Sequence, residues 1–558
     1  MKQRSLLFAM LMALMATAFA VSPKAVQAAS YSAGTVNDLL AAITSANADP
    51  QADTIILTGN ITLTSAAETD AAYGKSGLPA ITSDISIEGQ GHSIIRSAAV
   101  GTSDFRILRV ATGAHLTLYN LTISGGKAVT GSVCNAACGG GLFNEGTVTA
   151  IHTAFSSNSA ENGGGFYNTS DTATITDSIF LSNSASNRGG GVLVNAGTVT
   201  INDSVFSANI GGDGAGIYSV ADAFINHTTF NGNRASLRGG GLMGEDGNVK
   251  VDGSTFSNNY AEFSGGAGIV LDPGKMSFTN STFTGNMAAQ YKGGALFLDA
   301  LGSILVNDTF LKNSAALNGG SIYIYESDLA TIIENVIVAQ STPENCFLGL
   351  NFNSLVWPSN NLSDDATCDG FTHVKSLVPP KSLNLGPLAD NGGSTKTLAV
   401  NSPSPALDNA SAACFNPLTS GGGGGVDQRG FTRSINALGA VNFPQVGDCD
   451  TGAFEAGGVV RTLQFMFPSS SVANGSSMPI NIPLKLNSVL AQAQVVTGYV
   501  WVSGGTAVAG QDYAPFGVQA VTITTGMTTA NATIRPLTPF LASDKTIILS
   551  FATQHGPG

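Results

Sequence analysis

Apolar and polar residues alternate through most of the central part of the chain. Residues 199–202 and 249–252 are typical, because every second position in them is apolar, which is the period of a half-buried β-strand. Turns rich in glycine and asparagine separate these short stretches. The pattern predicts an all-β protein with many short strands.

A unit of about 25 residues repeats through this region. Each unit contains the pattern Phe-x-x-Asn, and glycines cluster eight to ten residues after each phenylalanine. Successive phenylalanines, from Phe155 to Phe310, lie 24 to 27 residues apart. The asparagines of the units are Asn158, Asn183, Asn209, Asn233, Asn259, Asn286 and Asn313. So regular a period indicates a repeat architecture.

Stacking of the units explains why each residue type recurs. One unit cannot bury its own apolar face, so neighbouring units must stack, which favours a right-handed parallel β-helix. The phenylalanines would then fill the interior, and the glycines would form tight corners. We expect the asparagines to take left-handed turns and to bond to one another in a structural ladder; a ligand-binding ladder is the alternative.

A second set of apolar residues directly follows the glycines and is expected to form another interior column. Its members are Leu142, Phe166, Val192, Ile217, Leu242, Ile269, Leu296 and Ile322.

Nearer the N-terminus, Leu39, Leu40 and Ile43 lie at helical spacing within residues 36–47. A short amphipathic helix there would cover the open end of the stack, where strand edges would otherwise be unpaired. Weaker coils are expected between this helix and the first glycine cluster.

The first residues have the pattern of an export signal. Lys2 and Arg4 precede an apolar run over residues 6–21, and small residues follow, which predicts cleavage after Ala28, with Ala20 as the alternative. A membrane anchor is disfavoured because the run is short for a bilayer. We therefore expect a secreted or outer cell-surface protein whose mature chain has no integral membrane span.

Charge and composition exclude several classes of protein. Only 11% of the residues are charged and 68 are glycine, which excludes coiled coils and acidic disordered chains. The net charge of −13 falls to −16 when the signal takes away three cations and no acids. Such a surface repels nucleic acid, so no nucleic-acid partner is expected.

Six cysteines, an even number, indicate disulfides in an exported chain. They are Cys134, Cys138, Cys346, Cys368, Cys414 and Cys449. We expect each to pair with its nearest neighbour in sequence. A zinc site at the first pair is disfavoured because no second pair or histidine ligands lie nearby, and no metal site is predicted.

The glycine and Phe-x-x-Asn motifs over residues 139–322 resemble the repeats of chlamydial polymorphic outer membrane proteins. Residues 36–43 and 52–57 are similar to the CSLREA-type module that often precedes such repeats, although the Cys-Ser-Leu-Arg lead is missing. The resemblance implies an architecture and not a ligand.

Further along, residues 385–395, 402–408, 427–433 and 449–455 are together similar to the choice-of-anchor Q family of exported bacterial proteins. That resemblance implies a cell-surface protein anchored by a variable C-terminal segment. It implies no catalytic residues.

The last hundred residues resemble a Calx-beta domain, a β-sandwich, on residues 502–507 and 509–513. In that family, acidic residues at strand ends bind Ca²⁺. Here Asn474 replaces an early Glu, and Asp512 and Asp544 are the acids left nearby. Because calcium sites need several carboxylates, we expect no cofactor. We also expect this domain to be incomplete at Gly558.

These observations divide the chain into five parts. We expect a signal peptide (1–28), a cap helix with the first coils (29–135), regular β-helix repeats (136–345), a C-terminal extension of the β-helix (346–458) and a Calx-beta-like sandwich (459–558).

Four acids of the repeat are the candidates for catalysis. Asp177, Asp203, Asp252 and Asp308 stand at different offsets from the phenylalanines, so we interpret most of them as solvent-facing turn residues. No catalytic residue is predicted.

One column suggests a binding surface. Just before the glycines stand Arg188, Asp213, Arg238 and Lys292, with aromatic residues beside them. The predicted ligand-binding stripe consists of Arg188, Arg238, Phe263, Tyr291 and Lys292. It would suit an anionic glycan through arginine contacts and ring stacking. The alternative is a solvated ladder of ion pairs.

Taken together, the sequence favours a non-enzymatic secreted or cell-surface β-helix for adhesion, with polysaccharide or another cell surface as partner. A polysaccharide lyase or glycoside hydrolase of the same fold is the alternative.

Overall fold

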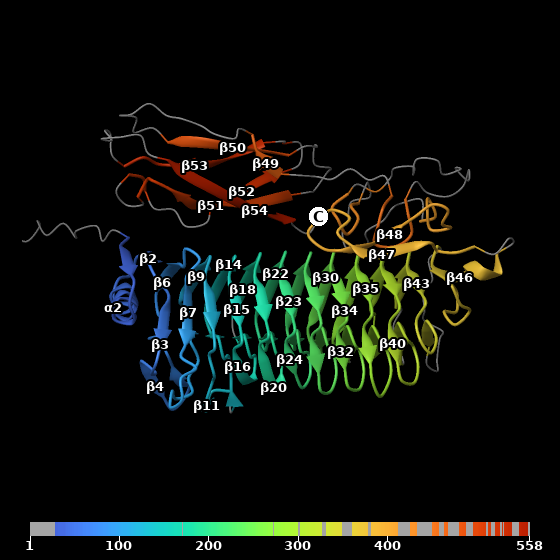
Figure 1. The fold of residues 1–558 in the computed structure, drawn as a ribbon, viewed down its shortest axis with the longest axis horizontal. Helices are drawn as coiled ribbons and strands as arrows, with labels where there is room; N and C mark the ends of the chain where they lie inside the picture. The colour runs from blue at the N-terminus through green and yellow to red at the C-terminus, as the bar shows by residue number, and fades with distance from the viewer. Residues whose placement is uncertain are drawn as a thin grey trace, which may run out of the picture.

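The protein is almost entirely β-structure, wound into a right-handed parallel β-solenoid of about 12 turns (Figure 1). The computed structural model describes residues 28–134, 136–169, 171–271, 273–299, 302–325, 331–348, 360–377, 381–410, 425–431, 433, 449–456, 463–466, 479–486, 495–508, 512–514, 519–524, 527, 529–537 and 546–555. The predicted signal peptide therefore lies almost wholly outside the described residues, as do Asn474 and Asp544.

Three long parallel sheets run the length of the stack. Sheet 1 has twelve strands, from β1 (Ser30–Ala33) to β42 (Ile332–Glu334), and sheet 2 has thirteen, from β3 (Ile61–Leu63) to β46 (Thr372–His373). The ten strands of sheet 3 are β8 (Leu108–Val110), β13 (Leu142–Asn144), β17 (Phe166–Asn168), β21 (Val192–Val194), β25 (Ile217–Ser219), β29 (Leu242–Gly244), β33 (Gly268–Leu271), β37 (Leu296–Asp299), β41 (Ile322–Ile324) and β44 (Cys346–Leu348).

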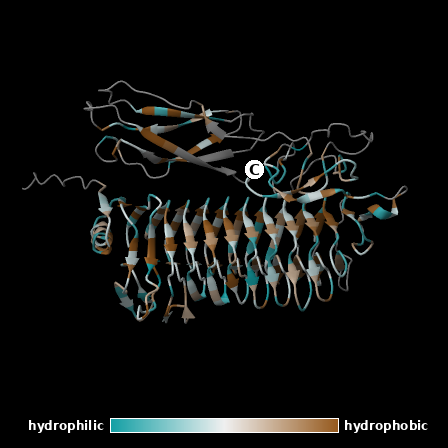
Figure 2. Ribbon diagram, viewed as in Figure 1, coloured by the Kyte–Doolittle hydropathy of each residue, from teal (hydrophilic) through white to brown (hydrophobic). Residues whose placement is uncertain are grey.

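A narrower fourth sheet, here called the corner sheet, lies between sheets 2 and 3 along the chain. Its strands are β16 (Ser159–Asn162), β20 (Ser184–Arg188), β24 (Ile210–Gly211), β28 (Arg234–Ala235), β32 (Tyr260–Ala261), β36 (Met287–Ala288) and β40 (Ser314–Ala315). Figure 2 shows the apolar residues concentrated on the strands of the stack.

Stacked phenylalanine rings fill the interior beside sheet 2. Ring centroids from Phe155 to Phe310 are 4.5 to 5.0 Å apart in successive coils, close to the spacing of neighbouring strands. All seven rings are fully buried. The burial of each one contributes roughly 2–3 kcal/mol, so this column is a main source of the stability of the stack.

The asparagines of the repeat form a buried ladder next to these rings. In Asn209, Nδ2 donates to Oδ1 of Asn233 (2.9 Å) and to the carbonyl of Phe180 (2.9 Å), and the backbone N–H donates to the same Oδ1 (3.0 Å). The other members repeat the pattern except Asn313, which ends the ladder by donating to Ser321 Oγ (3.1 Å). The expected left-handed conformation was wrong for these residues. It lies one position earlier, as at Ser182 (φ 53°) and Ala208 (φ 53°).

Glycine is required at the corner that leads into sheet 3. The first glycine of each cluster has φ between 59° and 68°, a left-handed conformation that favours glycine. A Cβ at Gly163 would also lie 2.7 Å from the carbonyl oxygen of Phe166. The predicted corner role of these glycines is therefore confirmed.

One residue of the expected apolar column was assigned to the wrong face. The interior position of that coil is Gly268, which pairs with Leu242 and Leu296, whereas Ile269 points outward. A slip of one residue reverses the face of a strand, and the extra glycine in this coil caused the slip. Phe278 of sheet 1 packs into the space beside Gly268, where an added Cβ would lie 3.6 Å from its ring.

Helix α2 (Val36–Asn47) covers the N-terminal end of the stack. Thr35 and Asp38 form a capping box at its start, and Leu39, Ile43 and Ala46 are buried against the first coils. The helix predicted from the apolar spacing is confirmed, and it protects the strand edges at this end.

The extension over residues 381–456 includes β47 (Leu385–Ala389) and β48 (Thr397–Val400) and runs back along the stack. It docks on the turns between sheets 1 and 2. Thr395 Oγ1 donates to the carbonyl of Gly253 (2.8 Å), and Gln428 Nε2 donates to Thr255 Oγ1 (2.7 Å).

Beyond it, two three-stranded antiparallel sheets follow. They consist of β49 (Leu463–Phe465), β50 (Ile480–Leu486) and β53 (Thr529–Ile534), and of β51 (Val495–Gly505), β52 (Gln519–Thr524) and β54 (Ile547–His555). Leu484, Val500 and Ile523 form their small core.

Two of the expected disulfides are present, Cys134–Cys138 and Cys346–Cys368. Cys449 is disulfide-bonded, and its expected partner Cys414 lies outside the described residues. Among the residues that the structure describes, no helix has both the length and the apolar character needed to cross a bilayer.

Candidate functional site

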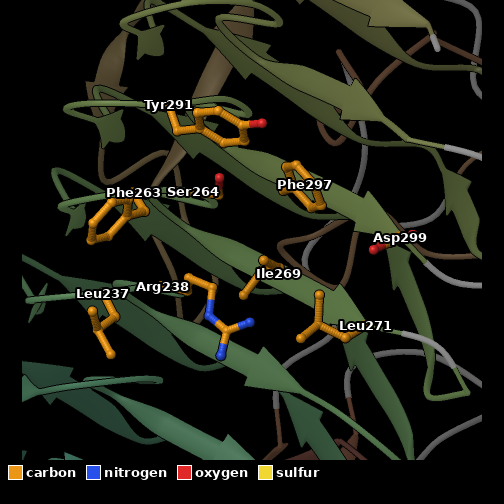
Figure 3. A pocket seen from close by; sticks show the side chains of 9 residues that line it. All are labelled: Leu237, Arg238, Phe263, Ser264, Ile269, Leu271, Tyr291, Phe297 and Asp299. Carbon is orange, nitrogen blue, oxygen red and sulfur yellow. The ribbon is translucent and has the colours of Figure 1, made fainter.

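A hollow of about 480 Å³ opens where the corner sheet meets sheet 3 (Figure 3). We call it the corner groove. Its lining residues are Leu237, Arg238, Phe263, Ser264, Ile269, Leu271, Tyr291, Phe297 and Asp299. Figure 3 shows Leu237, Phe263 and Tyr291 along one side, Ile269 and Phe297 in the middle, and Leu271 and Asp299 opposite.

The wall of the groove is part of a ridge of exposed apolar side chains. Leu237, Phe263 and Tyr291 are each 42% exposed and Leu317 is 49% exposed. The backbone N–H of Phe263 donates to the carbonyl of Leu237 (2.8 Å), and that of Leu317 to Tyr291 (2.9 Å). These contacts place the four residues at equivalent corners of four successive coils. At the usual strand spacing, the ridge from Leu237 to Leu317 is therefore about 14 Å long.

The floor of the groove consists of outward-facing side chains of β33 and β37. Ile269 and Phe297 belong to an apolar column on the outer face of sheet 3. Phe297 stacks on Tyr323 with centroids 5.0 Å apart, and Tyr323 stacks on Phe347 at 5.2 Å. Asp299 is the last residue of β37, and its side chain lies at the rim of the groove.

The cations beside the groove are paired within the protein. Arg238 donates through Nε and Nη2 to the carboxylate of Asp213 (3.1 and 3.0 Å). The guanidinium of Arg188 lies 3.9 Å from Glu245 and over the ring of Tyr218. The first contact is an ion pair between neighbours in the column, whereas Glu245 lies outside the column, directly after β29.

Lys292 pairs with aromatic hydroxyls instead. Its Nζ donates to the Tyr323 hydroxyl (2.8 Å) and lies 4.8 Å from the centroid of the Tyr291 ring. Partial burial opposes its charge, but the bond to Tyr323 and the nearby Tyr291 raise the pKa of Lys292 above its usual value.

The structure thus brings together part of the predicted stripe. Arg238, Phe263 and Tyr291 line the corner groove, whereas Arg188 and Lys292 are not among its lining residues. Sequence reasoning missed Leu237, Leu317 and the floor residues. The sequence does carry a signal for Leu237 and Leu317. Both stand two residues before the first glycine of a cluster, as Phe263 does, so comparing that position in every repeat unit would have found them.

The acids considered for catalysis lie elsewhere, on the turns between sheets 1 and 2. The interpretation as solvent-facing residues was wrong for Asp203 and Asp308, whose carboxylate oxygens are buried. Burial raises the pKa of Asp203 to about 7 and that of Asp308 well above its ordinary value. Asp252 accepts a hydrogen bond from Asn280 Nδ2 (3.0 Å). Asp177 stays partly exposed, with its carboxylate 2.9 Å from His152 Nδ1.

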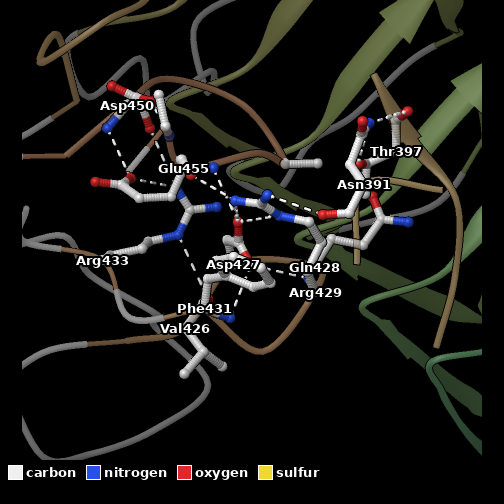
Figure 4. Close-up of polar contacts among 12 residues, drawn as sticks. Asn391, Thr397, Val426, Asp427, Gln428, Arg429, Phe431, Arg433, Asp450 and Glu455 are labelled. Carbon is white, nitrogen blue, oxygen red and sulfur yellow. Dashed lines mark hydrogen bonds and ion pairs between the residues drawn. The ribbon is translucent and has the colours of Figure 1, made fainter. Parts of the chain in front are cut away.

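A second polar cluster holds the extension together (Figure 4). Arg429 donates to the buried carboxylate of Asp427 (2.6 Å), and its guanidinium lies 3.7 Å from the ring centroids of both Phe431 and Phe454. This residue is 7% exposed. The arginine has no open face for a ligand, so its contacts are structural.

Arg433 connects this cluster to the coils. It donates to the carbonyls of Asp450 (3.1 Å) and Gly452 (2.8 Å) and to Asn280 Oδ1 (3.0 Å), and it lies 3.5 Å from Glu455. Burial raises the pKa of Glu455 to about 8 and that of Asp450 to about 6. Within the described parts of the chain, no group of three His, Cys, Asp or Glu side chains is placed to hold a metal ion.

Comparison with known protein families supports the fold. Residues 165–338 match the family model described as the right-handed β-helix region. The searches of curated proteins and of solved structures returned no match. The matched segment contains most of the phenylalanine and asparagine columns and the corner groove, so the groove belongs to a right-handed β-helix region.

Proposed function

We propose that this protein is an exported, non-enzymatic β-helix that binds carbohydrate on a surface through the corner groove. The observation that carries the proposal is the pair of exposed rings, Phe263 and Tyr291, on neighbouring coils above an apolar floor. A sugar ring has one face of C–H groups that packs on aromatic side chains and an edge of hydroxyls that needs hydrogen bonds. The groove offers both kinds of surface.

The position of the groove supports access by a large ligand. The extension and the antiparallel sheets lie along the upper side of the stack in Figure 1, whereas the corner sheet lies along the lower side. The ridge continues past the groove to Leu317. An extended chain could therefore contact several coils in sequence.

A binding role fits the chemistry of the groove better than hydrolysis does. Glycoside hydrolysis commonly uses two carboxylates facing each other across the bond. Of the described residues that line the groove, Asp299 alone carries a carboxylate. Asp213, the nearest acid of the column, is held by Arg238.

Export and surface display are supported by the N-terminal signal pattern and by the disulfides, which persist in oxidising compartments. The likeness of residues 385–395, 402–408, 427–433 and 449–455 to choice-of-anchor Q proteins supports attachment to a cell envelope.

A glycan array tests the proposal. We expect the purified chain to bind at least one class of polysaccharide, and the double variant Phe263→Ala/Tyr291→Ala to lose that binding. The matched control is Leu181→Ala, which truncates a side chain of equal exposure (43%) on sheet 2. The alternative is a lyase, which would release unsaturated products from pectin, alginate or chondroitin. Ultraviolet absorbance detects such products, and their appearance would favour the lyase.

A further inference from the structure

We infer that the corner groove takes an uncharged pyranose unit of a neutral polysaccharide. This inference rests on the proposed function and replaces the anionic glycan expected from the cationic stripe. It depends on how the charges around the groove are paired, which the sequence pattern does not show.

The strongest cation at the groove is already neutralised. Asp213 is only 5% exposed, and its two carboxylate oxygens accept from Nε and Nη2 of Arg238. The backbone N–H of Arg238 also donates to Asp213 (3.2 Å). An anionic sugar would have to compete with a charge-assisted, two-point contact that is formed before the ligand arrives.

The other two cations of the stripe also have partners within the protein. Arg188 lies near Glu245, and Asp299 stands on the rim facing the groove. Lys292 directs its ammonium group to Tyr323 and does not line the groove. Arg188 and Arg238 thus have carboxylate partners in Glu245 and Asp213, and Lys292 has a tyrosine hydroxyl. The formal charge of −13 on the whole chain further disfavours a polyanion.

What remains open in the groove suits a hydroxylated, uncharged ring. Phe263 and Tyr291 present exposed rings, and the largely buried Phe297 and Ile269 form an apolar floor. Arg238 has five N–H donors, and Asp213 uses two of them. The remaining donors can bond to hydroxyls at the edge of a sugar without a net change of charge.

Binding of two sets of oligosaccharides tests the inference. One set is neutral (β-1,4-linked glucose and mannose oligomers), and the other is acidic (oligogalacturonate and oligomannuronate). Each is titrated at low and at high salt. We expect the chain to bind a neutral oligomer with less than threefold change in Kd between the two salt concentrations, because no counterions are released.

Three variants separate the contributions. Phe263→Ala/Tyr291→Ala should weaken neutral binding at least tenfold. Arg188→Ala/Lys292→Ala, which leaves the Arg238–Asp213 pair intact, should change the Kd for the neutral oligomer by less than threefold. Leu181→Ala should not change this Kd. Circular dichroism confirms that each variant is folded, and the exposure of the ring side chains makes unfolding of the double variant unexpected.

Two results would contradict the inference in different ways. Tight binding of an acidic oligomer that weakens steeply with salt and is lost in Arg188→Ala/Lys292→Ala would overturn the neutral ligand and keep a carbohydrate-binding protein. Failure of both sets, together with a blank glycan array, would overturn the proposed function itself.

Discussion

The two long edges of the coil stack come from one repeat but differ in what covers them. At the edge between sheets 1 and 2, here called the docked edge, the extension contacts Thr255 through Gln428 and Asn280 through Arg433. At the edge between the corner sheet and sheet 3, here called the open edge, Phe263 and Tyr291 stay 42% exposed.

Polar and charged groups find different kinds of partner at the two edges. On the docked edge, polar groups of the coils meet partners 141 to 174 residues away in sequence. On the open edge, Arg238 pairs with Asp213 of the preceding coil. A docked edge therefore contributes stability, whereas an open edge leaves apolar surface available for a ligand.

Of the substitutions on the two edges, Arg433→Met on the docked edge should have the largest effect. Methionine retains bulk but leaves the carbonyls of Asp450 and Gly452 and the amide of Asn280 without this donor. Each unsatisfied buried acceptor costs about 1–3 kcal/mol, so we expect a loss of roughly 3 kcal/mol or more in the free energy of unfolding, measured by urea denaturation.

Arg234→Met is the matched control, because Arg234 forms an exposed ion pair with Glu262 at 3.9 Å. Such pairs contribute about 0–1 kcal/mol. Equal losses in the two variants would mean that the docked edge adds no special stability.

Stability should also fall as the pH rises from 6.5 to 9. Asp203 and Glu455 have folded-state pKa values of about 7 and about 8 because of burial. Both carboxyl groups bind protons more tightly in the folded chain than in the unfolded chain. Their contribution to the free energy of unfolding is therefore complete below their unfolded-state pKa values, near 4, and is lost as the pH rises through their folded-state pKa values.

Urea midpoints across this range measure the effect, and Glu455→Gln should reduce the slope. His227 does not interfere, because burial lowers its pKa to about 4 and its contribution is lost only as the pH falls below about 6.5. A midpoint that is constant from pH 6.5 to 9 would contradict the assignment.

A smaller change in stability, with a change in specificity, is expected for Asp213→Asn on the open edge. The substitution leaves the charge of Arg238 uncompensated while keeping the shape of the partner. We expect a loss of about 1–2 kcal/mol and a gain of binding to acidic oligosaccharides, measured by titration calorimetry. Unchanged selectivity would show that this pair does not set the charge of the groove.

The smallest effect on stability is expected for Phe263→Ala. An exposed side chain away from the core usually changes the free energy of unfolding by about 0.5 kcal/mol or less. Phe206→Ala, in the buried column, should cost about 3–5 kcal/mol. A large loss for Phe263→Ala, seen in the same urea assay, would make the ridge a structural feature.

Much of the architecture could be predicted from local patterns. The Phe-x-x-Asn spacing correctly indicated the buried ring column, and the helical spacing of Leu39 and Ile43 indicated the cap. The pattern failed at Ile269, because a glycine occupied the interior position and the first apolar residue after it was taken for the interior one. It failed again at Asp308, because this residue occupies the inward turn position that Ser254 and Ser281 hold in the two preceding coils.

The candidate site could be predicted only in part. Arg238, Phe263 and Tyr291 were found because charge and ring size are visible in a sequence. Leu237 and Leu317 were missed because an exposed leucine resembles a core residue until its coil position is known. The neutral charge of the groove depends on contacts between successive coils.

By itself, the sequence determined the coil, its period and its interior columns, because residues repeated every 24 to 27 positions must face one another once the coils stack. Only the tertiary structure decided which outward surface stays open. That outcome depends on where the distant Gln428 and Arg433 dock and on which carboxylate lies within reach of each arginine, and both follow from three-dimensional packing.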